Sequence, residues 1–244
     1  MTSRPVALVT GGGRGIGAAI SHRLAKDGYD VLLTYNSSSK PAEMLVDDIR
    51  TSGSDALAVK VDCSNQGEVD LLGIHPWMMR KIDVVILNHG VYERVDAKHM
   101  TMEQLQSTMN TNFNGAVQVW STVQQHLTPD ARLVVIGSQL GTKGSPHGAD
   151  YAASKAALAV WARSLALSVA KEGKRVNVIA PGYVDTDILS GDSDEKRTQR
   201  EHEVPLQRIG LPEDIANTVA FLVGNDSSYI TGAILHVNGG LYLP

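Results

Sequence analysis

The fold is decided by a stretch near the start of the chain, Thr10-Gly11-Gly12-Gly13-Arg14-Gly15-Ile16-Gly17. An apolar run, Val6 to Thr10, leads into this stretch, and a segment with helical spacing begins within it. Glycines let the backbone come close to a pyrophosphate, while the first turn of a helix offers unpaired N–H groups and the positive end of its dipole. A flexible glycine turn without a ligand is the alternative that the motif alone leaves open. We interpret the stretch as a dinucleotide-binding turn whose cofactor-binding residues are Gly11, Gly13, Arg14, Gly15, Ile16 and Gly17.

Apolar, β-rich runs recur along the chain and alternate with segments of helical spacing. Most of the runs do not alternate in polarity, which indicates strands that are buried on both faces. The runs are Val6 to Thr10, Val31 to Tyr35, Ala56 to Val61, Val84 to Leu87, Leu133 to Ile136, Val176 to Ile179 and Ile234 to Val237. Strands and helices in alternation imply right-handed crossovers, with ligands bound beyond the carboxyl ends of the strands. We therefore expect an α/β fold: a single Rossmann-type, doubly wound parallel sheet of about seven strands with helices on both faces, forming one domain over residues 1–244.

Composition and charge argue against several classes of protein. The 244 residues are 43% hydrophobic and 20% charged, as in an ordinary globular protein, and the formal net charge of −4 argues against binding to nucleic acid. No apolar run is long enough to cross a bilayer, and the start of the chain lacks the pattern of a secretion signal. The single cysteine, Cys63, has no partner for a disulfide and no cluster for a metal site. We expect a cytoplasmic protein without a metal or a membrane partner.

Two segments are expected to form the walls on the substrate side. A polar, charge-rich stretch, about residues 185–204, interrupts the alternation, and we interpret it as a mobile flap rather than a domain boundary. The other wall is expected from residues 139–150, which contain Gln139, Lys143, His147 and Asp150. The polarity of these two segments favours a polar or carrier-tethered substrate over a steroid.

The end of the second strand bears on the choice of cofactor. NAD-preferring sites usually carry an acidic residue there, about 20 residues after the glycine turn, which holds the ribose 2′-hydroxyl. Here the strand runs into Thr34-Tyr35-Asn36-Ser37-Ser38-Ser39-Lys40, which contains no acidic residue. A hydroxyl-rich loop together with Arg14 suits a 2′-phosphate, because a guanidinium pairs with phosphate through charge-assisted hydrogen bonds. We predict NADPH/NADP+ as the cofactor, bound in part by Tyr35, Asn36 and Ser37; the alternative is that Arg14 and the serines are solvated surface residues.

Four further residues form a catalytic pattern. Tyr151 and Lys155, in Tyr151-Ala152-Ala153-Ser154-Lys155, lie one helical turn apart on the same face. Ser138 follows the strand Leu133 to Ile136, and Asn112 precedes both. With the glycine turn, this arrangement resembles the short-chain dehydrogenase/reductase family over essentially the whole chain. Hydride delivery to a ketone builds negative charge on oxygen, which requires hydrogen-bond donors and then a proton.

The resemblance implies a role for each of these four residues. Tyr151 would be the general acid in reduction and the base in oxidation, and Lys155 would lower the tyrosine pKa and hold the nicotinamide ribose. Ser138 would orient the substrate carbonyl, and Asn112 would position a water in the proton relay. The alternative reading is a tyrosine and a lysine on a helix face, with a capping serine.

The resemblance also implies further contacts with the cofactor. Asp62, after the third strand, corresponds to the residue that contacts adenine; Cys63 lies beside it and is expected to be buried. The turn after the fourth strand keeps Asn88 and Gly90, but His89 replaces a small residue of the family; we interpret it as a bulkier turn residue rather than a proton carrier. A later stretch would hold the nicotinamide carboxamide, through Pro181, Gly182, Val184 and Thr186.

Within the family, the resemblance is greatest to 3-oxoacyl-acyl-carrier-protein reductases and polyketide ketoreductases. Two stretches near the carboxyl terminus carry it, Tyr229-Ile230-Thr231-Gly232 and Leu235-His236-Val237-Asn238-Gly239-Gly240. It implies NADPH-dependent reduction of a 3-oxoacyl thioester, linked to an acyl-carrier protein or CoA, and a homotetramer packed through helices at residues 103–127 and 151–170. In that branch a basic residue often precedes the glycine after the catalytic helix, but here Glu172 precedes Gly173. The nearby Lys171, Lys174 and Arg175 would either face a carrier protein or form a solvated helix end. The alternatives are an NAD(P)-dependent dehydrogenase of a small alcohol, sugar or other ketone, and a catalytically silent dinucleotide-binding protein.

Overall fold

All seven predicted strands are present, and they form one parallel sheet. The computed structural model describes residues 4–244. The strands are β1 (Val6–Val9), β2 (Asp30–Tyr35), β3 (Ala56–Lys60), β4 (Ile82–Leu87), β5 (Leu127–Ile136), β6 (Arg175–Pro181) and β7 (Ile234–Val237). Their order across the sheet is β3-β2-β1-β4-β5-β6-β7, and every neighbouring pair is parallel. The direction of winding therefore reverses between β1 and β4, which is where open sheets of this kind bind ligands.

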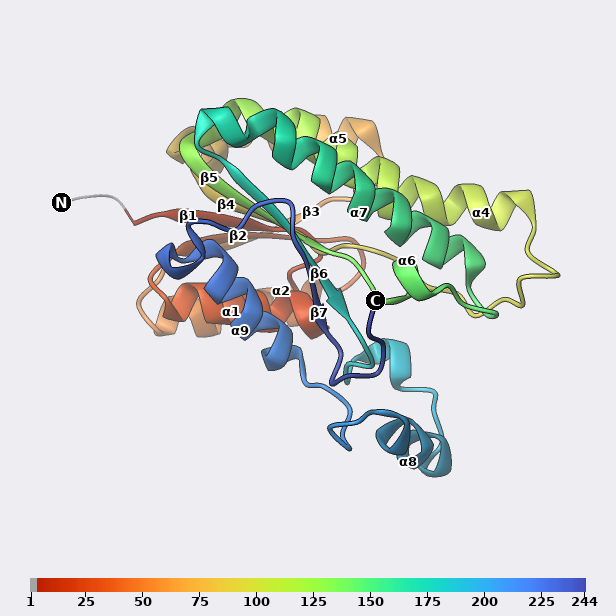
Figure 1. Cartoon of the computed structure of the whole chain (residues 1–244). Coiled ribbons are helices and arrows are strands. Elements are labelled where there is room, and N and C mark those ends of the chain that lie inside the picture. Colours follow the sequence, from red (N-terminus) through yellow and green to blue (C-terminus); the bar gives the residue numbers. More distant parts are fainter. Residues whose placement is uncertain (1–3) are drawn as a thin grey trace.

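Helices cover both faces of the sheet, which confirms the predicted fold class (Figure 1). One face carries α1 (Gly15–Lys26), α2 (Ser39–Thr51) and α9 (Pro212–Val223). The opposite face carries α3 (Gln66–Gly73), α4 (Met102–Met109), α5 (Gly115–Val123) and α7 (Ala149–Val169). The short helices α6 (Leu140–Lys143) and α8 (Asp194–Glu203) lie near the carboxyl ends of the strands, and α8 projects away from the layers.

Two apolar cores hold the layers together. Successive side chains of a strand point to opposite faces, so Leu8 packs in the core under α5 and α7, whereas Ala7 and Val9 pack in the core under α1 and α9. Burial of a large aliphatic side chain contributes about 1.5–3 kcal/mol relative to exposure. The unbroken apolar runs seen in the sequence are explained by this two-sided burial.

The largest boundary error concerns β5, which begins at Leu127 rather than at Leu133. Its first residues, Thr128 to Asp130, are polar or proline and are partly exposed, so they lack the apolar pattern of a buried strand. They continue the ladder because Ile82 pairs with Leu127 before the register shifts at a bulge. This extension lies at the amino end of the strand, away from the carboxyl edge.

Candidate active site

A cleft of about 640 Å³ opens along the carboxyl edge of the sheet. All residues predicted to bind the cofactor line it, and so does Ser138. They are Gly11, Gly13, Arg14, Gly15, Ile16, Gly17, Tyr35, Asn36, Ser37, Asp62, Cys63, Asn88, Gly90, Tyr151, Lys155, Pro181, Gly182, Val184 and Thr186. The structure thus brings segments from six strand ends to one surface.

The glycine turn is built by backbone contacts that exclude side chains. Gly11 and Gly15 adopt φ values of +60° and +51°, which L side chains rarely take. A Cβ on Gly17 would stand 2.1 Å from the carbonyl oxygen of Gly11. The Asn88 side-chain amide donates hydrogen bonds to the carbonyl oxygens of Thr10 (3.2 Å) and Gly11 (3.0 Å), so the turn after β4 braces the turn after β1.

The start of α1 faces the cleft with its first amide groups. Arg14 is the N-cap, and its side chain makes no capping hydrogen bond. The residues of the first turn, Gly15 to Gly17, all line the cleft. A helix start of this kind attracts anions through its N–H groups and its dipole. A backbone cradle that a Cβ would fill, next to an open helix start, fits a dinucleotide pyrophosphate.

Two charged side chains, Arg14 and Asp62, line the cleft beside this cradle. The Arg14 guanidinium pairs with Asp187 across the cleft at 2.8 Å, and both side chains are more than half exposed. The Asp62 carboxylate accepts hydrogen bonds from the Ser64 hydroxyl (2.7 Å) and the Ser64 amide (2.9 Å). The Ser64 hydroxyl holds the pKa of Asp62 below its usual range, so this carboxylate stays ionised and able to accept a hydrogen bond from a ligand.

Tyr151 and Lys155 enter the cleft from the first turns of α7. Burial raises the pKa of Tyr151 to about 12; a hydrogen bond with the Ser138 hydroxyl opposes this shift, and the nearby Tyr92 adds to it. Burial lowers the pKa of Lys155 to about 8. The Lys155 ammonium donates a 2.9 Å hydrogen bond to the Ile136 carbonyl oxygen and lies 5.6 Å from the centroid of the Tyr151 ring.

The pKa of Tyr151 is set mainly by its burial. Burial of the phenol raises this pKa, and the Lys155 ammonium donates its hydrogen bond to the Ile136 carbonyl oxygen. The lowering of the tyrosine pKa by Lys155 stays a prediction. The consequence for chemistry is simple. A phenol with a pKa near 12 keeps its proton at neutral pH, which is the state that a proton donor requires.

Asn112 is the one predicted catalytic residue whose side chain does not reach the cleft wall. It lies in a π-helical turn, Asn110–Asn114, between α4 and α5, and it is fully buried. Its amide donates to the Val91 carbonyl oxygen and to the Ser154 hydroxyl, both at 3.0 Å, and its oxygen accepts from the Val91 amide at 2.8 Å. The side chain therefore ties the loop after β4 to α7. The sequence could not show this, because Asn112 and its two partners, Val91 and Ser154, are far apart in the chain.

His89 occupies the turn as a neutral ring. Its Nδ1 lies 2.7 Å from the Thr10 hydroxyl, and among the described residues its buried Nε2 has no hydrogen-bond partner. Burial, with the Lys155 charge second, lowers the pKa of His89 to about 4. A ring with this pKa takes up almost no proton at neutral pH, which supports its interpretation as a bulkier turn residue over that of a proton carrier.

The residues that line the cleft differ in part from the walls expected on the substrate side. Gln139 and Leu140 line it, but Lys143, His147 and Asp150 do not. Asp150 is instead buried and accepts a 2.6 Å hydrogen bond from the Thr108 hydroxyl. The expected flap contributes Ile188, Leu189, Lys196 and Arg200. Val91, Tyr92 and Arg94 also line the cleft and were not expected there; their position in the loop after the end of β4 was the available signal.

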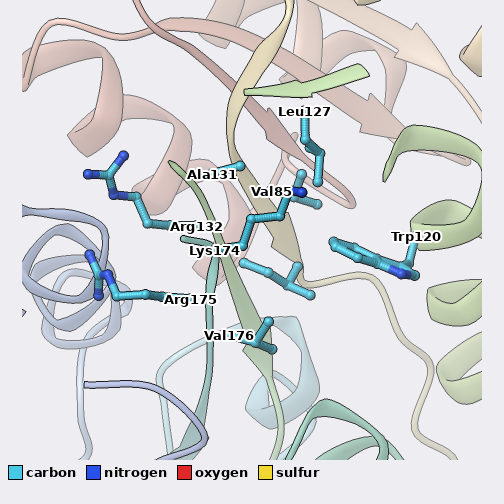
Figure 2. A pocket seen from close by; sticks show the side chains of 9 residues that line it. Val85, Trp120, Leu127, Ala131, Arg132, Lys174, Arg175 and Val176 are labelled. Atoms are coloured by element: carbon cyan, nitrogen blue, oxygen red, sulfur yellow. The ribbon is translucent and has the colours of Figure 1, made fainter. Parts of the chain in front are cut away.

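A hollow at the amino ends of β5 and β6 differs from this cleft. There the side chains of Val85, Trp120, Leu127, Arg132 and Arg175 surround a hollow without room for a water molecule (Figure 2). The Arg175 guanidinium donates to carbonyl oxygens at the end of α9 and in the turn that follows. Residues 4–244 contain no cluster of three potential metal ligands, and no helix among them is long and apolar enough to cross a membrane.

Comparison with known proteins supplies the context for this geometry. The family model described as Enoyl-(Acyl carrier protein) reductase matches residues 11–242. The chain is 34% identical over 240 residues to the 3-oxoacyl-[acyl-carrier-protein] reductase FabG of Staphylococcus aureus, covering 97% of this chain and 98% of the relative. It is also 34% identical over 238 residues to the 3-oxoacyl-[acyl-carrier-protein] reductase MabA of Mycobacterium tuberculosis, covering 96% and 91%.

Solved structures show the same architecture. A short chain dehydrogenase from Burkholderia cenocepacia J2315 in complex with NADP superposes with a TM-score of 0.91 at 34% identity, over 97% of each chain. A blue fluorescent protein from a metagenomic library in complex with NADPH superposes with a TM-score of 0.92 at 35% identity, over 98% of each chain. Both similarities extend over nearly the full length.

Proposed function

The chain belongs to the short-chain dehydrogenase/reductase family and is an NADP-dependent oxidoreductase, and from this we propose that it reduces a 3-oxoacyl thioester to the 3-hydroxyacyl product. The observation that carries the proposal is that Ser138, Tyr151 and Lys155 line one cleft together with the glycine turn. The names of the FabG and MabA relatives support the 3-oxoacyl class of substrate.

The residues of the chain divide the chemistry among them. NADPH, when bound, supplies the hydride that reduces the carbonyl carbon. The hydroxyls of Ser138 and Tyr151 form a pair that can hold the carbonyl oxygen, and Tyr151 gives its proton to that oxygen as negative charge develops there. Lys155, with a pKa of about 8, is mostly protonated at neutral pH; its ammonium lies 5.6 Å from the centroid of the Tyr151 ring and would stabilise the negative charge left on the phenolate. Arg14, Asn36 and Ser37 would hold the 2′-phosphate.

The basic residues near Gly173 give little support to docking of a carrier protein. Lys174 pairs with Glu172, and the Arg175 guanidinium is bound by carbonyl oxygens of the protein itself. Two of the three cations are thus already engaged. A 3-oxoacyl thioester of a small thiol is therefore the appropriate first test substrate.

We further propose a homotetramer formed through the α5 and α7 faces. Val160 and Leu167, both on α7, are 61% and 84% exposed, which leaves apolar area for a partner to cover. Trp120 is buried in the core, and Trp161 is packed against it, so neither is needed for the contact. Light scattering should give the mass of about four chains of 26.1 kDa. A mass of one chain would contradict the tetramer.

The substrate class is tested by following NADPH absorbance. Acetoacetyl thioesters of N-acetylcysteamine and of CoA are compared with a panel of simple ketones, sugars and alcohols under the same conditions. We expect the thioesters to give the highest kcat/KM. A preference for a simple ketone or sugar would replace the substrate class, and absence of turnover with every substrate would leave a dinucleotide-binding protein without activity.

A further inference from the structure

Tyr92 lies beside the proposed proton donor, in the loop that follows the turn after β4. Its ring meets the Tyr151 ring edge to face, with centroids 5.0 Å apart and planes inclined at 75°. Its side chain is only partly buried and lines the same cleft as Ser138, Gln139 and Tyr151. An aromatic pair of this geometry contributes about 0.5–1.5 kcal/mol beyond the burial of its area. The Tyr92 ring thus packs against Tyr151 and forms part of the cleft wall beside it.

Two contacts prevent the Tyr92 ring from moving aside. Its hydroxyl donates a 2.8 Å hydrogen bond to the carbonyl oxygen of His147. Gly148, at a φ of +124°, packs so closely that a Cβ there would lie 2.6 Å from Cε2 of Tyr92. Swinging the ring away from the cleft would break the hydrogen bond, and turning it toward Gly148 would meet backbone. The ring is therefore a fixed part of the wall.

The loops on both sides of this contact are joined by backbone hydrogen bonding as well. Asp96 and His147 form an antiparallel bridge, and the Ala97 amide donates a 2.9 Å hydrogen bond to the carbonyl oxygen of Pro146. The His147 ring also lies 3.9 Å from the Asp96 carboxylate. The loop after β4 and the loop before α7 consequently behave as one unit, with Tyr92 at its inner surface.

This arrangement restricts what can stand next to the reacting carbonyl. A carbonyl oxygen within hydrogen-bond reach of the Tyr151 hydroxyl, about 2.6–3.2 Å, brings the two carbon substituents against the cleft walls. One of these walls is the Tyr92 ring, which is held by its hydrogen bond to His147 and by Gly148. A substituent branched at the carbon next to the carbonyl is wider beside this ring than an unbranched one, so we expect the ring to disfavour it.

We propose that Tyr92 is a specificity-determining and positioning residue that selects substrates unbranched at the carbon next to the reacting carbonyl. Its hydroxyl already donates to His147, so Tyr92 acts through its ring and is not a proton donor in the reaction. The proposal rests on the proposed function for its substrate class, a linear 3-oxoacyl thioester.

The test compares three variants on a pair of substrates. The substrates are the acetoacetyl and 2-methylacetoacetyl thioesters of N-acetylcysteamine, and the readout is the ratio of their kcat/KM values. Tyr92→Ala should raise the ratio of branched to unbranched substrate about tenfold, as expected when a pocket gains the space of several carbon atoms. Tyr92→Phe keeps the ring and should leave the ratio within about threefold of wild type, with a lower kcat from the lost hydrogen bond. Glu93→Ala, at an exposed neighbour outside the cleft, should leave both rates unchanged.

The outcomes separate this inference from the proposed function. If Tyr92→Ala melts at a markedly lower temperature, Tyr92→Leu replaces it in the same assay. A ratio that stays at the wild-type value while both rates fall equally would show a purely structural role and overturn the inference. If the wild type reduces simple ketones but no thioester, the proposed function fails. The ratio of kcat/KM for a branched ketone, 3,3-dimethyl-2-butanone, to that for an unbranched one, 2-butanone, is then measured. A higher ratio in Tyr92→Ala than in wild type supports the role of Tyr92, and an unchanged ratio overturns it.

Discussion

The glycine turn (residues 10–17) and the charged flap (residues 185–204) face each other across one cleft, but different interactions hold them. In the turn, backbone packs on backbone, as where Gly17 leaves no space for a Cβ beside the Gly11 carbonyl. In the flap, pairs of charged side chains dominate, such as Arg197 with Asp185 at 2.6 Å. The backbone packing of the turn leaves no room for an added atom. A partly exposed ion pair, as in the flap, contributes at most about 1 kcal/mol to stability. We therefore expect the turn to be the rigid half of the cleft, which holds the cofactor, and the flap to be the adaptable half, which faces the substrate.

The largest effect is expected at Tyr151, which enters the same cleft from α7. Tyr151→Phe removes the proton donor and keeps the ring against Tyr92. Loss of a general acid costs about 10²–10⁴ in rate, so kcat should fall by about 10³. Steady-state NADPH oxidation measures it, with thermal melting as the control for folding. Activity within tenfold of wild type would remove Tyr151 from the chemistry.

The next prediction compares the stability effect of an alanine substitution in the turn with that of one in the flap. Gly17→Ala places a Cβ 2.1 Å from a backbone oxygen and should lower the free energy of unfolding by about 3 kcal/mol. Gly191→Ala, in the flap, meets no atom within 4 Å and should raise the free energy of unfolding by about 0.5 kcal/mol, by restricting the unfolded chain. Urea denaturation measures both. Equal losses in the two variants would mean that the flap is packed as tightly as the turn.

A smaller effect is expected at Arg14, which reaches from the turn toward Asp187 of the flap. Arg14→Ala should raise KM for NADPH about tenfold, the equivalent of one charge-assisted contact with phosphate. KM for NADH should change little, because NADH has no 2′-phosphate. Parallel titrations with both cofactors provide the measurement. An equal rise for both would assign Arg14 to the shared part of the dinucleotide.

The smallest effect concerns acid stability at His89, beneath the cofactor half. The pKa of His89 is about 4 in the folded chain and about 6.5 when unfolded, so between these values the unfolded state binds more protons. Stability is therefore lost as the pH falls from about 6.5 toward 4. His89→Ala should reduce the loss of unfolding free energy between pH 7 and pH 5 by about 1 kcal/mol; this value allows for the partial exposure of the His89 side chain. His202→Ala, at an exposed histidine of α8, is the control for removing an imidazole. An unchanged pH dependence in His89→Ala would mean that His89 titrates equally in both states.

The sequence could predict the strands and the glycine turn, but not the contacts that side chains make between distant loops. Strands buried on both faces and a glycine turn depend on neighbours in the chain, so β1, β2 and the turn at residues 10–17 could be read directly. Side chains that act across loops could not. Asn112 was expected at the cleft but binds Val91 and Ser154 behind its wall, and the ring of Tyr92 gained its place only when two distant loops met.

The central claim is that the turn holds the cofactor while Tyr151 serves the chemistry, and a titration of NADPH tests it most directly. Fluorescence titrations would use the wild type, Gly17→Ala and Tyr151→Phe. We predict that Gly17→Ala binds NADPH at least about tenfold more weakly, whereas Tyr151→Phe stays within about threefold of wild type. Wild-type affinity in Gly17→Ala, or an equal loss in both variants, would contradict the account.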